Sequence, residues 1–126
     1  MFKSSIKRLW VCSSDQLLDG SYRRIEATYA GELTSVLVFR YKGQCLAYRN
    51  LCVHMPRELD CEKDMIFDAT GQNLRCSMHG IVYDPITGQS ISTMCNGKRL
   101  TSVRIVEDEE GIWINDKRVK KFVLAE

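Results

Sequence analysis

The chain has 126 residues, of which 44% are hydrophobic and 27% are charged, and its formal net charge is +2. This length suits one domain, and the small net charge gives no argument for nucleic acid or a membrane surface as a partner. No run approaches the roughly 18 apolar residues that a membrane span needs, and the opening segment lacks the apolar centre of a secretory signal. We therefore expect a cytoplasmic protein that binds neither membranes nor nucleic acid.

The N-terminal part begins with one weak helical signal and continues as strands. The segment DQLLDG at 15–20 predicts a single turn of helix. Residues 22–30 and 32–41 are rich in β-branched and aromatic side chains, which favours strands. The tripeptide KGQ at 42–44 then predicts a tight turn into a further strand, because its glycine can adopt a positive φ. Residues 22–49 are thus predicted to form a β meander.

The remaining chain divides into a loop-rich middle and a C-terminal hairpin. Residues 50–96 hold many turn residues, both histidines and four of the six cysteines. Alternating apolar and polar residues over 99–107 and 112–116 predict two strands around an acidic turn. A last strand is expected over 120–126, where it closes the sheet.

These signals predict an all-β protein with a single domain over 1–126. Strands from both ends of the chain, 1–49 and 97–126, form a β base. Residues 50–96 form a loop-rich subdomain inserted into that base. No segment shows helical periodicity over a useful length, so we expect no helix in the core.

Both histidines follow a cysteine at a short spacing, as Cys52-Val53-His54 and as Cys76-Ser77-Met78-His79. Side chains two residues apart in an extended chain point to the same side, and the Gly80 that follows His79 lets backbone amides approach closely. One thiolate and one imidazole from each loop suit either tetrahedral zinc or a two-iron cluster. Zinc is the second choice, because zinc sites of this composition usually pair cysteine with cysteine and histidine with histidine.

The pattern C-x-H, twenty-one residues, then C-x-x-H-G resembles the Rieske iron-sulfur proteins, in particular the small Rieske-type ferredoxins. In that family an aromatic residue, an aspartate and Thr-Gly commonly follow, and this chain has Tyr83, Asp84, Thr87 and Gly88 in those places. The resemblance implies a fold of three antiparallel sheets, one 2Fe-2S cluster and single-electron transfer.

The resemblance also assigns the metal ligands. It places Cys52 and Cys76 on the inner iron, and His54 and His79 on the outer iron that takes the electron. Around these ligands we expect a second layer of residues, namely Tyr83, Gly80, Met55 and Met78.

The chain departs from the Rieske subunits of cytochrome bc complexes at three points. Their two ligand loops carry a further pair of cysteines that form a disulfide, and the matching residues here are Arg57 and Met78. Their serine after the second motif is Ile81 in this chain, whereas their tyrosine is matched by Tyr83. The segment 55–75 is also longer than in the commonest oxygenase ferredoxins. These differences concern the redox partner and leave the cluster ligands in place.

The expected function is that of a monomeric one-electron carrier between a reductase and a separate oxygenase or reductase. The alternative is a small redox or regulatory subunit fixed to a larger enzyme, as in nitrite reductase, and a structural zinc module is a third reading. We expect no catalytic residue, because both imidazoles serve as ligands and none is left for a mononuclear iron site or a nucleophile pair. The remaining cysteines are expected to be ordinary core or surface thiols, and these are Cys12, Cys45, Cys61 and Cys95.

Overall fold

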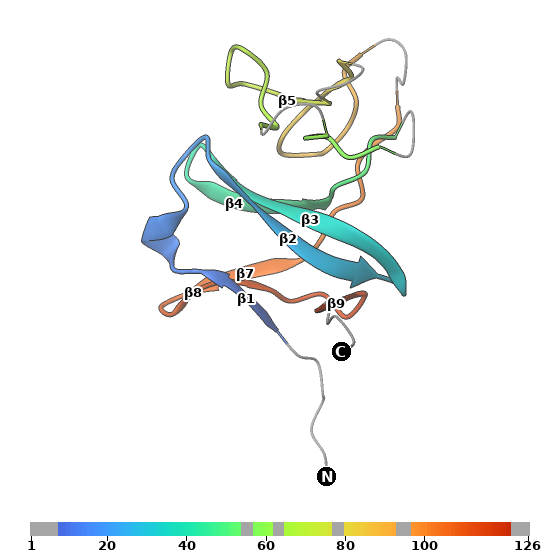
Figure 1. The fold of residues 1–126 in the computed structure, drawn as a ribbon. Coiled ribbons are helices and arrows are strands. Elements are labelled where there is room, and N and C mark those ends of the chain that lie inside the picture. Colours follow the sequence, from blue (N-terminus) through green and yellow to red (C-terminus); the bar gives the residue numbers. More distant parts are fainter. Residues whose placement is uncertain (1–7, 54–56, 62–64, 77–79, 93–96, 122–126) are drawn as a thin grey trace.

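Three antiparallel β-sheets make up the regular structure of this computed structural model, which describes residues 8–53, 57–61, 65–76, 80–92 and 97–121. The first sheet has the strand order β4-β3-β2-β9, the second has the order β1-β8-β7, and the third pairs β5 with β6 (Figure 1). The all-β class and the three antiparallel sheets predicted from the sequence are confirmed. The strand bounds are β1 Leu9–Cys12, β2 Tyr22–Tyr29, β3 Glu32–Tyr41, β4 Gln44–Arg49, β5 Leu74–Arg75, β6 Val82–Tyr83, β7 Ile105–Asp108, β8 Gly111–Ile114 and β9 Val119–Lys121.

The meander predicted over residues 22–49 is present as β2, β3 and β4. β3 pairs antiparallel with β2 on one side and with β4 on the other. Between β3 and β4, Lys42 and Gly43 have φ values of 51° and 82°. This left-handed conformation at both central residues is what a two-residue hairpin turn requires. The glycine of the KGQ segment therefore supplies the predicted turn.

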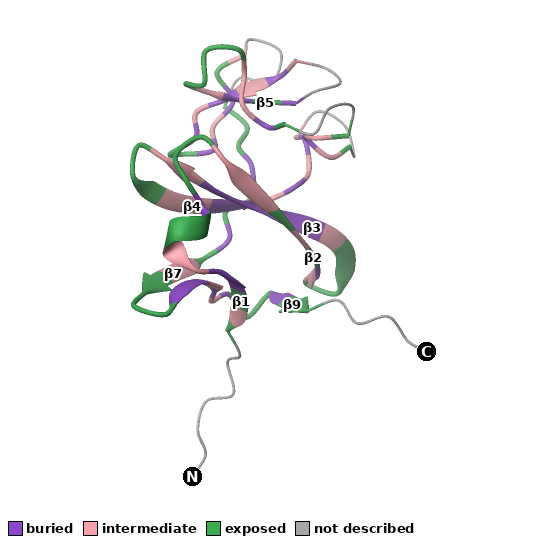
Figure 2. Ribbon diagram, turned by 60° about the vertical axis from the view of Figure 1, so that its left-hand side comes forward, coloured by how far each residue is buried: buried purple, intermediate pink, exposed green. Residues whose placement is uncertain are grey.

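Strand β3 lies between two hydrophobic cores, because its successive side chains point to opposite faces of the sheet. Val36 and Val38 pack in one core with buried residues of β1 and β8. Leu37 and Phe39 pack in the other core, which contains Cys52 and further buried residues of the loop-rich segment 50–96, called the lobe below. Figure 2 shows the buried part of β3 between the lobe and the sheet of β1, β8 and β7. The four-stranded sheet thus carries the lobe on one face and the rest of the base on the other.

The structure differs from the predicted elements near both ends of the chain. β1 is not predicted, since four residues are too few to show a pattern and their partner strand β8 is distant in sequence. The strand expected from residue 99 begins only at Ile105, and Ser102 instead makes an isolated bridge to Tyr48. β9 ends the described chain, so most of the strand expected over 120–126 lies outside the described residues.

The helical turn predicted at 15–20 is a short 3₁₀-helix at Ser14–Gln16. Ser13 is its N-cap residue, and the Ser13 backbone amide donates to the Gln16 side chain at 3.1 Å. The described residues contain no helix that is long and apolar enough to cross a membrane.

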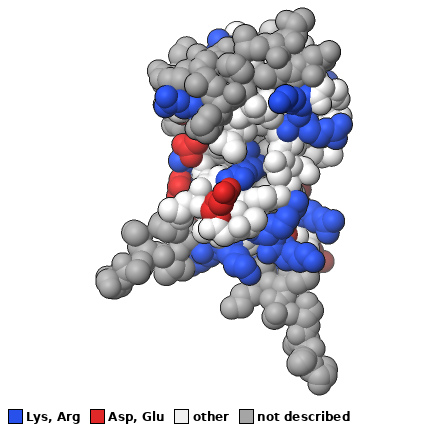
Figure 3. All heavy atoms as spheres, turned by 90° about the vertical axis from the view of Figure 1, so that its right-hand side faces the viewer, with Lys and Arg blue, Asp and Glu red and all other residues white. Residues whose placement is uncertain are grey.

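Basic side chains gather on the base, below the lobe, on the face drawn in Figure 3. Arg104, Lys117 and Arg118 line a hollow together with Asp116. The buried Asp116 carboxylate lies 2.6 Å from Arg118, and this hydrogen bond holds the pKa of Asp116 well below its usual range. Asp116 also accepts a hydrogen bond from the Arg104 amide at 3.0 Å. These charges therefore fix the connection between β8 and β9.

Candidate metal centre

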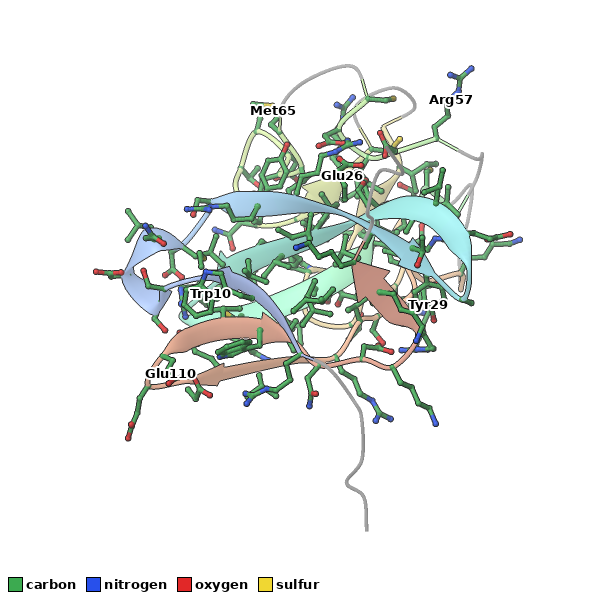
Figure 4. All side chains as sticks on the ribbon, turned by 60° about the horizontal axis from the view of Figure 1, so that its bottom comes forward. Trp10, Glu26, Tyr29, Arg57, Met65 and Glu110 are labelled. Atoms are coloured by element: carbon green, nitrogen blue, oxygen red, sulfur yellow. The ribbon has the colours of Figure 1, made fainter. Side chains whose placement is uncertain are left out.

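The first cysteine loop, residues 52–57, follows β4 and is closed by one backbone hydrogen bond. The Cys52 amide donates to the Arg57 carbonyl at 2.7 Å, and Cys52 is only 3% exposed. Arg57 is exposed, and its side chain points away from the rest of the molecule (Figure 4). The loop therefore buries its cysteine and exposes its last residue.

The second cysteine loop, residues 76–81, follows β5 and closes in the same way. The Cys76 amide donates to the Ile81 carbonyl at 2.9 Å, and the Gly80 amide donates to the Cys76 carbonyl at 2.8 Å. Gly80 has a φ of +74°, and a Cβ atom there would lie 3.2 Å from the Arg75 guanidinium. Glycine therefore suits this turn both in backbone conformation and in the space available.

Tyr83 connects the two cysteine loops. Its hydroxyl donates to Cys52 Sγ at 3.3 Å and accepts a hydrogen bond from the Val53 amide at 3.2 Å. Burial, with the hydrogen bond to Cys52 as a further cause, raises the pKa of Tyr83 far above its usual value. The Cys76 thiol also acts electrostatically on this phenol. Both cysteines therefore lie near one hydroxyl, which stays protonated at neutral pH and remains a donor.

A tight turn directly after Tyr83 holds that residue in place. The Asp84 carboxylate accepts hydrogen bonds from the amides of Ile86 and Thr87, at 2.8 and 3.3 Å. The Asp84 carbonyl accepts the Gly88 amide at 2.8 Å. Gly88 has a φ of +76°, which favours glycine. The aspartate and the glycine of the YDPITG segment therefore both serve to shape the turn.

The site residues predicted from the sequence fall into two groups. One group lies together in or beside the core of the lobe and consists of Cys52, Cys76, Gly80 and Tyr83. The other lies outside the described residues and consists of His54, Met55, Met78 and His79. For this second group the roles assigned from the sequence stay predictions.

The remaining described cysteines have environments unlike that of the two loop cysteines. Cys12 lies in the core of the base, and Cys45 packs against that core. Burial raises the pKa of both thiols, that of Cys45 to about 11. Such thiols are protonated at neutral pH and are poor metal ligands. Cys61 is exposed, and Cys95 lies outside the described residues.

Sequence reasoning misses a polar clamp beneath the first cysteine loop, formed by Asn50, Ser35, Asp60 and the Leu59 amide. The Asn50 side chain accepts a hydrogen bond from the Leu59 amide at 2.8 Å. It donates to Ser35 Oγ at 2.9 Å and to Asp60 at 3.0 Å. The clamp ties both ends of the loop to β3. In the sequence Asn50 looks like an ordinary turn residue after a strand, since its partners are not its neighbours.

Two buried thiols beside a hydrogen-bond donor suit a metal centre. A thiolate inside an apolar core is costly unless a cation or donors offset its charge. Tyr83 is such a donor, and an iron ion bound to both sulfurs would supply the positive charge. The described part of the site therefore fits the inner iron of a two-iron cluster.

Solved structures share this fold. The ferredoxin of carbazole 1,9a-dioxygenase from Nocardioides aromaticivorans IC177 is 23% identical, with a TM-score of 0.66 over 86% of this chain and 97% of that chain. A chain in the complex of reduced oxygenase and oxidized ferredoxin of carbazole 1,9a-dioxygenase is also 23% identical, with a TM-score of 0.70 over 95% of this chain and 100% of that one. A chain in the reduced complex between oxygenase and ferredoxin is 17% identical, with a TM-score of 0.68, and matches over 87% of this chain but only 28% of that chain.

The sequence itself identifies the family. A search of curated proteins found no significant match. The Rieske [2Fe-2S] domain family, by contrast, matches residues 7–115, which is most of the chain and includes both cysteine loops and Tyr83. The chain therefore belongs to the Rieske [2Fe-2S] domain family, and its cofactor is one 2Fe-2S cluster.

Proposed function

We propose that this protein is a one-electron carrier in which Cys52 and Cys76 hold the inner iron and His54 and His79 hold the outer iron. The cluster supplies the redox chemistry, since it takes up and releases one electron. The main structural support for this proposal is Tyr83. Its hydroxyl lies 3.3 Å from Cys52 Sγ, and both cysteines act electrostatically on it. We also propose that residues 50–96 are the cluster-binding subdomain.

The ligand set decides the range of the reduction potential. Two ferric ions, two sulfides and two thiolates carry no net charge when the imidazoles are neutral, whereas four thiolates would leave a net negative charge. An uncharged centre accepts an electron more readily. Rieske clusters accordingly have potentials of about −150 to +300 mV, against about −400 mV for plant-type ferredoxins with cysteine ligands alone.

The chain's own residues contribute shielding and a hydrogen bond. The core of the lobe buries both cysteines and Tyr83, which excludes water from the sulfur side of the cluster. The Tyr83 donor stabilises the reduced form, which carries one more negative charge than the oxidised form. We propose that Met55 and Met78 add an apolar rim beside the histidines, where a partner docks briefly.

We propose that the electron passes from a reductase to a separate oxygenase, that the protein is a cytoplasmic monomer, and that it has no catalytic residue of its own. Support comes from the neighbours, since the similar chain from Nocardioides is a dioxygenase ferredoxin of nearly the same extent. Docking of this kind is transient and buries less than about 1,200 Å². Isolation in a stable stoichiometric complex with a larger enzyme would favour a fixed subunit instead.

Metal analysis of the purified protein tests the ligand assignment. We expect a brown protein with two irons and two acid-labile sulfides per chain. His79→Ala should lose the cluster, because the outer iron would lose half of its protein ligands. Cys61→Ser is the control and should keep it, since Cys61 is exposed. One zinc per chain without visible absorption, or bleaching by Cys61→Ser, would contradict the assignment.

A further inference from the structure

Tyr48 joins the base to the turn that follows Tyr83. It belongs to β4 and is only 2% exposed. Its hydroxyl lies 2.8 Å from the Pro85 carbonyl oxygen and 3.0 Å from that of Ile86. Burial raises the pKa of Tyr48 to about 12, so the hydroxyl is a donor at neutral pH. A residue of the sheet thus shares its one O–H hydrogen between two carbonyls of a turn in the lobe.

The Tyr48 ring also packs closely against its neighbours, Phe39 and Gly88. It stacks on Phe39 with the ring centroids 5.9 Å apart. On the side of the turn it lies against Gly88, where a Cβ atom would approach Tyr48 Cε1 to 2.7 Å. The turn over residues 84–88 is therefore held at its centre by the hydroxyl and at its end by the ring.

This turn is directly linked to the hydrogen bond at the cysteine sulfur. Tyr83 immediately precedes it, and the Asp84 amide donates to the Gln89 carbonyl at 2.9 Å, which closes the turn at its base. Tyr83 also forms an isolated bridge with Ser90 on the far side of the turn. A displacement of the turn therefore reaches Tyr83 from both sides, and Tyr83 in turn bonds Cys52.

We propose that Tyr48 is a positioning residue, which fixes the turn over residues 84–88, holds the Tyr83 hydroxyl against Cys52 Sγ and thereby helps to set the reduction potential of the cluster. The inference rests on the proposed function, since it takes Cys52 to be a cluster ligand. Tyr48 acts through Tyr83 and does not itself contact a cysteine.

A double-mutant cycle tests this role, because coupled residues give effects that do not add. The midpoint potential is measured by voltammetry for the wild type, Tyr48→Phe, Tyr83→Phe and the double variant, each loaded with its cluster. Introduced into the wild type, Tyr48→Phe should lower the midpoint potential, but by less than Tyr83→Phe does. In the Tyr83→Phe background it should cause no further shift.

Tyr41→Phe is the matched control. The Tyr41 hydroxyl also joins the base to the lobe, but it donates to the Gln72 carbonyl at 3.0 Å, away from the turn after Tyr83. Tyr41→Phe should lower the melting temperature and leave the potential unchanged. If Tyr48→Phe does not hold a cluster, Pro85→Ala replaces it in the cycle, since it loosens the same turn and keeps the Tyr48 hydroxyl.

Two results would overturn the inference alone. One is a loaded Tyr48→Phe, or Pro85→Ala in its place, that melts earlier but keeps the wild-type potential. The other is an equal shift in both backgrounds, which would mean that Tyr48 acts independently of Tyr83. A wild-type protein that binds no 2Fe-2S cluster contradicts the proposed function and this inference with it.

Discussion

Tyr83 is the residue through which the chain acts most directly on the cluster. Its hydroxyl has one hydrogen to donate, and that hydrogen goes to Cys52 Sγ while the Val53 amide donates to its oxygen. The Tyr83 oxygen is thus held by two hydrogen bonds to the first cysteine loop. Because the reduced cluster is more negative than the oxidised one, this donor stabilises the reduced form and raises the potential.

Tyr83→Phe should therefore lower the midpoint potential. The ring is buried and the substitution keeps its shape, so packing in the lobe changes little. If the hydrogen bond is stronger in the reduced form by about 1 kcal/mol, the shift is about 40 mV, at about 59 mV per 1.4 kcal/mol for one electron. Voltammetry on both proteins measures it. A potential equal to that of the wild type would mean that the phenol does not act on the cluster.

A turn can need glycine for its positive φ or for the lack of space for a side chain, and a comparison of Gly88 with Gly71 distinguishes these two reasons. Their φ values are nearly equal, +76° and +74°, but a Cβ at Gly88 would lie 2.7 Å from the Tyr48 ring, whereas none of the described atoms lies within 4 Å of one at Gly71. Gly71→Ala should thus cost about 1 kcal/mol of unfolding free energy, and Gly88→Ala about 2–4 kcal/mol. Urea unfolding measures both. Equal costs would show that the Tyr48 contact contributes nothing.

At the scale of elements, the end of β4 organises both cysteine loops. Tyr48 and Asn50 are two residues apart, so their side chains leave the chain on the same side. Tyr48 holds the turn next to the second loop, and Asn50 holds the polar clamp beneath the first. Arg24 on β2 extends the clamp, with ion pairs to Glu58 and Asp60 at 2.8 and 3.0 Å.

Asn50→Ala should open the polar clamp and destabilise the protein. The Leu59 amide would lose its partner, and Ser35 and Asp60 would each lose a donor. Groups left unpaired in a buried site typically cost about 2–3 kcal/mol in all. Asn73→Ala is the control, because Asn73 makes one side-chain bond within a surface turn and should cost less than about 1 kcal/mol. Equal melting temperatures for the two variants would contradict the clamp.

The elements show which parts of the fold a sequence can predict. The meander is predictable because the β-branched and aromatic residues of β3 and the glycine after Lys42 are local signals. β1 is not predictable, because it pairs with β8, which lies near the other end of the chain. In the site, spacing alone singles out Cys52 and Cys76. The roles of Tyr48 and Asn50 are not predicted. A tyrosine in a strand is expected simply to pack in the core, and the hydrogen-bond partners of both residues are distant in the sequence.

At the scale of the whole molecule, an ion pair joins the two sheets of the base. Arg40 on β3 lies 2.8 Å from Glu107 on β7, and its guanidinium also donates to the carbonyl oxygen of Leu17 at 2.6 Å. The hydrogen bond from Arg40, followed by one from Ser14, lowers the pKa of Glu107 from 4.5 to about 2. Glu107, in the strand that leads into the acidic turn, thus carries a structural charge.

Glu107→Gln should destabilise the protein in a pH-dependent way. The folded-state pKa lies below the unfolded one, so the stabilisation is complete above about pH 4.5 and is lost as the pH falls towards 2. We expect a loss of about 1–2 kcal/mol at pH 7, reduced from the full effect by solvent screening. Urea unfolding at several pH values should show the difference from the wild type shrinking below pH 4.5.

Glu110→Gln is the control for the same hairpin, where the Glu110 side chain points away from the molecule (Figure 4). It should leave the unfolding free energy nearly unchanged at every pH. A difference between Glu107→Gln and the wild type that stays constant down to pH 2 would contradict the assigned ion pair.

The midpoint potential of the wild-type protein tests the central claim, a 2Fe-2S cluster held by two cysteines and two histidines. The uncharged oxidised centre places the value within the Rieske range of about −150 to +300 mV. Tyr83 is a donor to sulfur and Ile81 offers none from its side chain, so we expect the lower part of that range, below about +100 mV. A value near −400 mV, typical of clusters with cysteine ligands alone, or no redox wave at all, would contradict the account.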